Sequence, residues 1–121
     1  MKKFVYFLIS SLISYSAMSA EIVLLQTGKS FVQGIDEEKA KAIAENRDEV
    51  KKYSLEELKV KVGDTVNFKN VDSVKHNVVA EDMFNFVQPF GSSDKYKFEK
   101  KGSYSVRCAI HPKMKIKVQV D

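Results

Sequence analysis

From residue 58 onward the sequence alternates apolar and polar residues, and this period of two is the feature that most restricts the possible fold. In the first and last runs the apolar positions are Leu58, Val60, Val62, Ile116, Val118 and Val120. Alternation of this kind places every second side chain on the same face of a β-strand, so that one face can be buried. Clusters of glycine, asparagine and aspartate separate the runs, as turns separate antiparallel strands. The pattern therefore predicts an all-β fold, an antiparallel β-sandwich.

One segment, residues 34–57, departs from this pattern because it is rich in charge and its apolar residues recur at helical spacing. These apolar residues are Ile35, Ala40, Ile43, Ala44 and Val50. Asp36 is a typical N-cap, and Lys51 and Lys52 are favourable at the negative end of a helix dipole. We predict one helical insertion over residues 36–52, lying on the surface because its apolar stripe is narrow.

The first 20 residues have the composition of a secretory signal peptide. Two lysines are followed by an apolar stretch over residues 4–13 and then by small residues up to Ala20. The stretch is shorter than a membrane-spanning helix, which needs about 20 apolar residues. Cleavage can fall after Ala20 or after Ser19. With cleavage after Ala20, a signal peptide at 1–20 is removed and 21–121 remains as one domain in the periplasm. The alternative is a retained anchor; a lipoprotein is disfavoured because no cysteine lies at the cleavage point.

The predicted mature domain is only mildly basic, since removal of two lysines lowers the net charge from +4 to +2. The sequence has no basic run and no aromatic platform interleaved with arginine, so it gives no reason to expect nucleic-acid binding. Charge is unevenly spread, because residues 34–57 carry a net −3 and residues 58–121 a net +5. We expect a monomer without stable membrane insertion. Its basic residues either form a rim that attracts acidic partners or are simply a solvated lysine face.

The chain contains a single cysteine, Cys108, and an exported protein with one cysteine cannot form an internal disulfide. An unprotected thiol is open to oxidation in an oxidising compartment. Cys108 is therefore expected either to be buried and inert or to be held by a metal ion.

Three side chains that can bind a metal lie within seven residues at the end of the predicted strand that contains Cys108. The segment CAIHPKM places His111 and Met114 shortly after the cysteine, and Pro112 stiffens the return of the chain. Thiolate, imidazole and thioether form a soft ligand set, and one cysteine, two histidines and a weak axial methionine define a blue copper site. The second histidine has to be His76, because the chain has two histidines in all. The predicted copper ligands are His76, Cys108, His111 and Met114.

Three other interpretations compete with a copper site. Each ligand taken alone is more often an ordinary core or surface residue, since a lone cysteine commonly behaves as a small buried side chain. Structural zinc takes four cysteine or histidine ligands, whereas this chain offers three. A Cys–His hydrolase needs a base hydrogen-bonded to the thiol and an oxyanion hole, and the C-x-x-H spacing indicates neither. A single copper site, in contrast, accounts for the only cysteine and both histidines of the chain at once.

Three segments of the sequence carry a family resemblance. They are CAIHPKM, with the pattern C-x-x-H-P-x-M, VKVGDTVNFKNVDSVKHNVV over residues 60–79, and KGSYSVRC over residues 101–108. Together they resemble the cupredoxins, the type 1 blue copper proteins, and within that family the amicyanin and plastocyanin-like members, because the ligand loop is as short as in the amicyanin group. The resemblance covers residues 58–121 and, more weakly, residues 25–31, and the segment 34–57 is longer than the corresponding connection in the family.

The resemblance implies a Greek-key arrangement of the strands and a role for each residue of the site. The implied ligands are His76 as the more buried equatorial ligand, Cys108 as the thiolate, His111 as the exposed equatorial ligand and Met114 as the axial ligand. Asn77 and Pro112 would support these ligands without touching the metal, Asn77 by holding the two ligand loops together. The alternative for Asn77 is an amide that caps a turn.

A site of this kind is expected to carry single electrons between redox proteins by cycling between Cu(II) and Cu(I), without enzymatic catalysis. Electrons would leave through His111, which is expected to lie within an apolar patch. The candidates for this patch are Phe84, Phe86, Pro89, Phe90 and Pro112. The alternative is that these residues pack in the core or in loops. The expected partners are transient ones such as a c-type cytochrome or a dehydrogenase. The alternative function is a periplasmic copper chaperone or storage protein that uses the same ligands.

Overall fold

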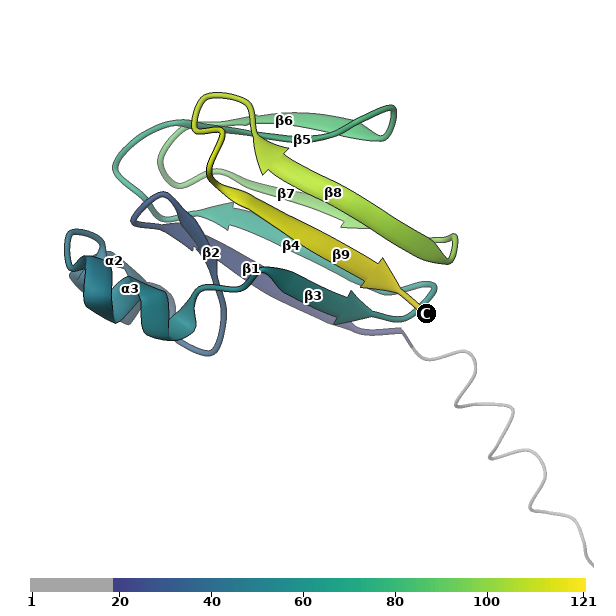
Figure 1. The fold of residues 1–121 in the computed structure, drawn as a ribbon, viewed down its shortest axis with the longest axis horizontal. Helices are drawn as coiled ribbons and strands as arrows, with labels where there is room; N and C mark the ends of the chain where they lie inside the picture. Colours follow the sequence, from purple (N-terminus) through teal and green to yellow (C-terminus); the bar gives the residue numbers. More distant parts are fainter. Residues whose placement is uncertain (1–18) are drawn as a thin grey trace, which may run out of the picture.

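The computed structural model describes residues 19–121 as two β-sheets packed face to face, with two short helices beside one of them (Figure 1). The predicted signal peptide at 1–20 falls almost entirely outside these described residues, so its cleavage stays a prediction. No helix among residues 19–121 is long and apolar enough to cross a membrane.

The two sheets contain four and five strands. Across the smaller sheet lie, in order, β2 (Ser30–Val32), β1 (Glu21–Thr27), β4 (Thr65–Asn70) and β7 (Ser93–Lys97). Across the larger sheet lie β3 (Glu57–Val60), β9 (Lys115–Val120), β8 (Gly102–Cys108), β5 (His76–Ala80) and β6 (Phe84–Gln88). The chain crosses between the sheets repeatedly, so that neighbouring strands are often distant in sequence. The prediction of a β-sandwich is confirmed.

Two strand pairs are parallel, whereas the predicted sandwich was antiparallel throughout. β1 runs parallel to β4 with Glu21 opposite Thr65, and β3 runs parallel to β9 with Leu58 opposite Val118. The other pairs of named strands are antiparallel. Alternation of apolar and polar residues determines which face of a strand is buried but not the direction of its neighbour, so the pattern could not predict the parallel pairs.

The alternating apolar positions form the core between the sheets. Those predicted and found buried are Leu58, Val60, Ile116, Val118 and Val120, whereas Val62 lies beyond the end of β3 and is 45% exposed. Phe68 of β4 is fully buried, and its ring centroid lies 5.4 Å from that of Phe84 and 6.2 Å from that of Phe86. Cys108 belongs to the same cluster, so the predicted metal site is continuous with the core.

The helical insertion consists of α2 (Glu37–Ile43) and α3 (Arg47–Tyr53), and the prediction of one helix over 36–52 is wrong in this respect. The side chain of Asn46 accepts a hydrogen bond from the Glu49 N–H group at 3.2 Å and so caps the start of a second helix. Asparagine favours such caps over helix interiors, because its short side chain competes for backbone N–H groups.

The insertion is fixed to the outer face of the smaller sheet at the β1–β2 hairpin (Figure 1). Asp36 caps α2 as predicted, and its carboxylate accepts a hydrogen bond from the Lys39 N–H group at 2.8 Å. A second apolar cluster joins helices and sheet through Leu25, Val32, Ala40, Ile43, Val50 and Val71. The buried hydroxyl of Thr27 also donates a hydrogen bond to the carbonyl of Ala40 at 2.6 Å.

Candidate metal centre

The pairing of β5 with β8 brings together two predicted ligands that are 32 residues apart in the chain. His76 is the first residue of β5 and Cys108 is the last residue of β8, and Val78 lies opposite Cys108 in the sheet. Just beyond the sheet, the N–H group of Ala109 donates a hydrogen bond to the carbonyl of Asn77 at 2.8 Å. The register of the sheet therefore fixes both side chains at the same end of the sandwich.

The loop between β8 and β9 folds back and directs a second histidine to the same place. The Cys108 N–H group donates to the carbonyl of Met114 at 2.9 Å, and the Met114 N–H group donates to the carbonyl of His111 at 2.9 Å. Pro112 lies exposed in this return, where its fixed backbone angle suits the tight path. The Met114 side chain is 3% exposed and belongs to the core cluster. Two backbone hydrogen bonds thus close the loop before β9 begins.

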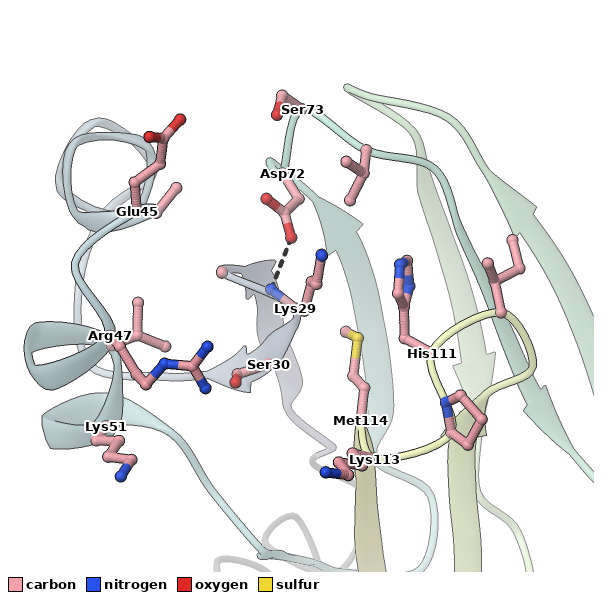
Figure 2. A pocket seen from close by; sticks show the side chains of 16 residues that line it. Lys29, Ser30, Glu45, Arg47, Lys51, Asp72, Ser73, His111, Lys113 and Met114 are labelled. Carbon is pink, nitrogen blue, oxygen red and sulfur yellow. Dashed lines mark hydrogen bonds between the residues drawn. The ribbon is translucent and has the colours of Figure 1, made fainter.

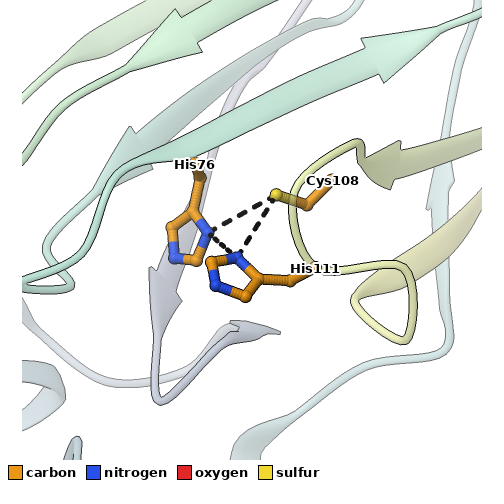
Figure 3. Close-up of side chains that lie close together, drawn as sticks. All are labelled: His76, Cys108 and His111. Atoms are coloured by element: carbon orange, nitrogen blue, oxygen red, sulfur yellow. Dashed lines mark hydrogen bonds between the residues drawn. The ribbon is translucent and has the colours of Figure 1, made fainter.

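Three donor atoms form a small triangle (Figure 3). The Nδ1 atoms of His76 and His111 lie 3.2 Å apart, and each lies 3.6 Å from the sulfur of Cys108. The point equidistant from the three atoms lies about 2.0 Å from each, which matches metal–nitrogen bonds of about 2.0–2.1 Å and is about 0.3 Å short of a metal–sulfur bond. The three side chains therefore fit one metal ion.

The kind of donor selects among the metals that could bind here. A thiolate and two imidazoles suit copper, and copper also tolerates a weak fourth ligand such as the predicted thioether of the buried Met114. Met114 lines the same cavity as His111, on the side of the helical insertion (Figure 2). The structure thus brings together three of the four predicted ligands, and the axial role of Met114 stays a prediction.

The environment of Cys108 favours a thiolate. Burial raises the pKa of this thiol, but hydrogen bonds from the Asn77 N–H group and from His76 outweigh burial, so the pKa lies below its usual value. The Asn77 N–H group lies 3.4 Å from the sulfur. The Asn77 side chain instead donates to Asn85 and to the carbonyl of Phe86 on β6. The backbone of Asn77, more than its amide, connects the two ligand segments.

The buried ligand candidate His76 has a partner that the sequence did not indicate. Its Nε2 atom lies 3.0 Å from an oxygen of Asp72, and both side chains are buried. Burial lowers the pKa of His76, but the hydrogen bonds to Asp72 and Cys108 outweigh it and leave the pKa above its usual value. Burial conversely raises the pKa of Asp72, and hydrogen bonds from His76 and Lys29 bring it below its usual value.

His111 differs from His76 because it lines a cavity of about 850 Å³ that reaches the surface between the ligand loop and the helical insertion (Figure 2). Burial and the positive charges of His76 and Lys29 lower the pKa of His111. Four basic residues line the cavity, namely Lys29, Arg47, Lys51 and Lys113, against the two acids Glu45 and Asp72. His111 is thus the ligand candidate that a partner could approach.

The apolar patch around His111 differs from the one predicted. Phe84 and Phe86 stack on each other with ring centroids 4.7 Å apart and pack against the core. Phe90 is exposed, but Lys41 of the insertion lies over its ring. Of the predicted residues, Pro112 lines the cavity beside His111, together with the exposed Val74 and Ile110. The sequence did not indicate the last two because isolated apolar residues in loops carry no periodic signal.

Comparison with known proteins identifies the family of the chain. The chain matches the family model of copper-binding proteins of the plastocyanin/azurin family over residues 38–121. It is similar to a reduced amicyanin variant in which a proline is replaced by phenylalanine, with 26% identity, a TM-score of 0.59, and coverage of 84% of this chain and 82% of that one. No curated protein sequence matches the chain significantly.

Two further solved structures share the fold. Amicyanin from Paracoccus versutus is 20% identical with a TM-score of 0.59, covering 84% of this chain and 81% of that one. A purple cupredoxin from Nitrosopumilus maritimus is 24% identical with a TM-score of 0.56, covering 85% and 100%. The family match and the group of His76, Cys108 and His111 identify the cofactor as one copper ion. The predicted resemblance is confirmed, and the chain belongs to the plastocyanin/azurin family of copper-binding proteins.

Proposed function

We propose that the protein is a blue copper electron carrier, not an enzyme, and that it works in the periplasm. The observation that carries the proposal is the triangle of Cys108 Sγ and the Nδ1 atoms of His76 and His111, with sides of 3.2 and 3.6 Å. Copper held there supplies a one-electron couple between Cu(II) and Cu(I). The composition of residues 1–20 supports export.

The contribution of the protein is to hold the donor atoms in positions that suit both oxidation states. His76 and Cys108 are fully buried, and the loop that presents His111 is closed by two backbone hydrogen bonds. Side chains that are fixed by close packing move little when a charge changes nearby. Little reorganisation then accompanies each electron, which is what a carrier requires.

A copper titration tests this proposal. One equivalent of Cu(II) added to the purified protein should give an intense blue absorption and a reversible one-electron wave in voltammetry. A colourless protein that binds zinc tightly would contradict the proposal. Copper that passes to an apo-acceptor but shows no reversible wave would instead identify the chaperone or storage function.

We propose that redox partners such as a c-type cytochrome or a dehydrogenase approach His111 from the cavity side. Val74, Ile110 and Pro112 offer exposed apolar contacts there, and the basic residues of the cavity would attract an acidic partner. Transient redox complexes bury little surface, so steering by charge strongly affects how often they form.

Reversing one charge at this rim should slow the encounter. We expect Lys113→Glu to lower the second-order rate of electron transfer to an acidic c-type cytochrome by about tenfold at low ionic strength. Stopped-flow kinetics across a salt series would measure it. Lys101→Glu makes the same charge change in the turn before β8, at the far end of the strand from Cys108, and should have a much smaller effect. Rates that do not respond to salt would exclude steering.

A further inference from the structure

Asp72 is a buried carboxylate that contacts the predicted ligand His76 from behind. It lies in the connection between β4 and β5 and is 5% exposed. One of its oxygens lies 3.0 Å from His76 Nε2 and accepts a hydrogen bond from the Lys29 N–H group at 2.8 Å. Its own N–H group donates to the side chain of Asn70 at 2.9 Å. A buried carboxylate requires hydrogen-bond donors, and the Asp72 carboxylate has the Lys29 N–H group and the His76 ring.

The contact fixes which nitrogen of His76 faces the other ligands. When Nε2 donates to Asp72, the ring keeps its proton on that side and directs the lone pair of Nδ1 toward Cys108 and His111 (Figure 3). A carboxylate behind a histidine also makes the ring a more basic ligand. Asp72 therefore acts on both the position and the donor strength of His76.

The helical insertion in turn holds the backbone that binds Asp72. Gly28 and Lys29 form the β1–β2 turn with φ angles of 58° and 60°. This turn lies directly under the insertion, because a Cβ atom on Gly28 would come 2.8 Å from Val50 Cγ2 and 2.9 Å from the carbonyl oxygen of Ala44. Figure 2 shows the order in space, with the helices on one side, then Lys29 hydrogen-bonded to Asp72, then His111.

We propose that Asp72 is a positioning residue for His76 that favours Cu(II) over Cu(I), and that the helical insertion keeps its carboxylate in place through the Gly28–Lys29 turn. The inference rests on the proposed function and assigns a task to the segment 34–57. A fixed negative charge stabilises the more highly charged oxidation state, and burial protects that effect from screening by salt.

Substitution of Asp72 by asparagine separates charge from position. The His76 ring and the Lys29 N–H group both contact the same carboxylate oxygen, Oδ2 of Asp72. The single amide oxygen in Asp72→Asn can therefore keep both contacts while the negative charge is lost. We expect a relative stabilisation of Cu(I) by about tenfold, which for one electron raises the reduction potential by about 59 mV. Asp72→Ala should also lower the affinity for Cu(II), by about 10–100-fold. Voltammetry and copper competition measure the two effects.

The control is another buried carboxylate held by a backbone N–H group. Asp64 is 8% exposed and, within the predicted mature domain, accepts a hydrogen bond from the Lys61 N–H group at 2.9 Å, at the far end of β4. Asp64→Asn should leave the potential and the copper affinity unchanged. An equal shift in both variants would overturn the proposal, because it would show a general effect of net charge.

The role of the insertion has its own pair of variants. Gly28→Ala should shift the potential in the same direction as Asp72→Asn, because the added methyl group displaces the turn. Gly34→Ala also places a side chain at a positive φ of 90° but meets nothing within 4 Å, and it should not shift the potential. A folded Gly28→Ala protein with the wild-type potential would exclude the insertion from the mechanism.

The wild-type protein alone gives a further test. In the reduced protein, NMR should detect a slowly exchanging proton on Nε2 of His76, since that proton is buried against Asp72; a rapidly exchanging one would overturn the proposal. If the wild type fails to become blue with copper, the proposed function itself is wrong. If it becomes blue but Asp72→Asn keeps the wild-type potential, only the role of Asp72 is wrong.

Discussion

Replacing Cys108 with serine should abolish the intense blue absorption of the copper-loaded protein and lower its copper affinity by more than 100-fold. The colour of such a site comes from charge transfer between the thiolate and Cu(II). A serine hydroxyl stays protonated near neutral pH and is a hard, weak donor for copper. Since loss of a residue behind a ligand already costs about 10–100-fold in affinity, loss of the thiolate should cost more. Visible spectroscopy and copper competition provide the measurement.

Val106→Thr is the matched control for this experiment. Val106 is fully buried two residues before Cys108 on the same strand, so the variant also places a hydroxyl in the sheet but leaves every ligand intact. It should remain blue. Loss of colour in both variants would point to a disturbed fold, and a blue Cys108→Ser protein would show that the thiolate is not the ligand.

The largest effect on stability is expected from Phe68→Ala. Phe68 is fully buried between the sheets and its ring contacts Phe84 and Phe86, so the truncation leaves a cavity that the rigid sheets fill poorly. Such a change costs about 3–5 kcal/mol of the free energy of unfolding. That is a large share of the 5–15 kcal/mol typical of a domain. Urea unfolding followed by circular dichroism would measure the shift in midpoint.

Val87→Ala controls for the removal of apolar surface as such. Val87 lies on β6, beside Phe86, but is 59% exposed, and its truncation should change the free energy of unfolding by less than about 0.5 kcal/mol. If Phe68→Ala destabilised the protein no more than Val87→Ala, the packing between the sheets described above would be wrong.

The buried faces of the strands could be predicted from the sequence, whereas the arrangement of the strands could not. Period-two alternation is a local signal, and it correctly predicted burial at Leu58, Val60 and Val118. The parallel pairing of β3 with β9 joins segments more than 50 residues apart and leaves no local trace. Asn46, the N-cap of α3, is a local signal for the break between α2 and α3. It was missed because the helical spacing of the apolar residues continues across it.

In the candidate site, too, some residues could be predicted from the sequence and others could not. CAIHPKM encodes two of the grouped ligand candidates in one loop, and counting histidines supplied His76. Asp72 could not be predicted because its role depends on Lys29, 43 residues earlier in the chain, and on a hairpin turn that packs against the helices. Ligands can thus be predicted from their spacing, but the residues that orient them are determined by tertiary contacts.

The separation of His76 from Cys108 along the chain has a consequence for the order of events during maturation. The two donors are 32 residues apart and come together only through the pairing of β5 with β8, so an unfolded chain lacks the complete three-donor site. Assembly of the blue site must then wait until this sheet has formed. When the unfolded protein is diluted from denaturant in the presence of copper, the time at which the blue colour first appears would therefore report when β5 pairs with β8.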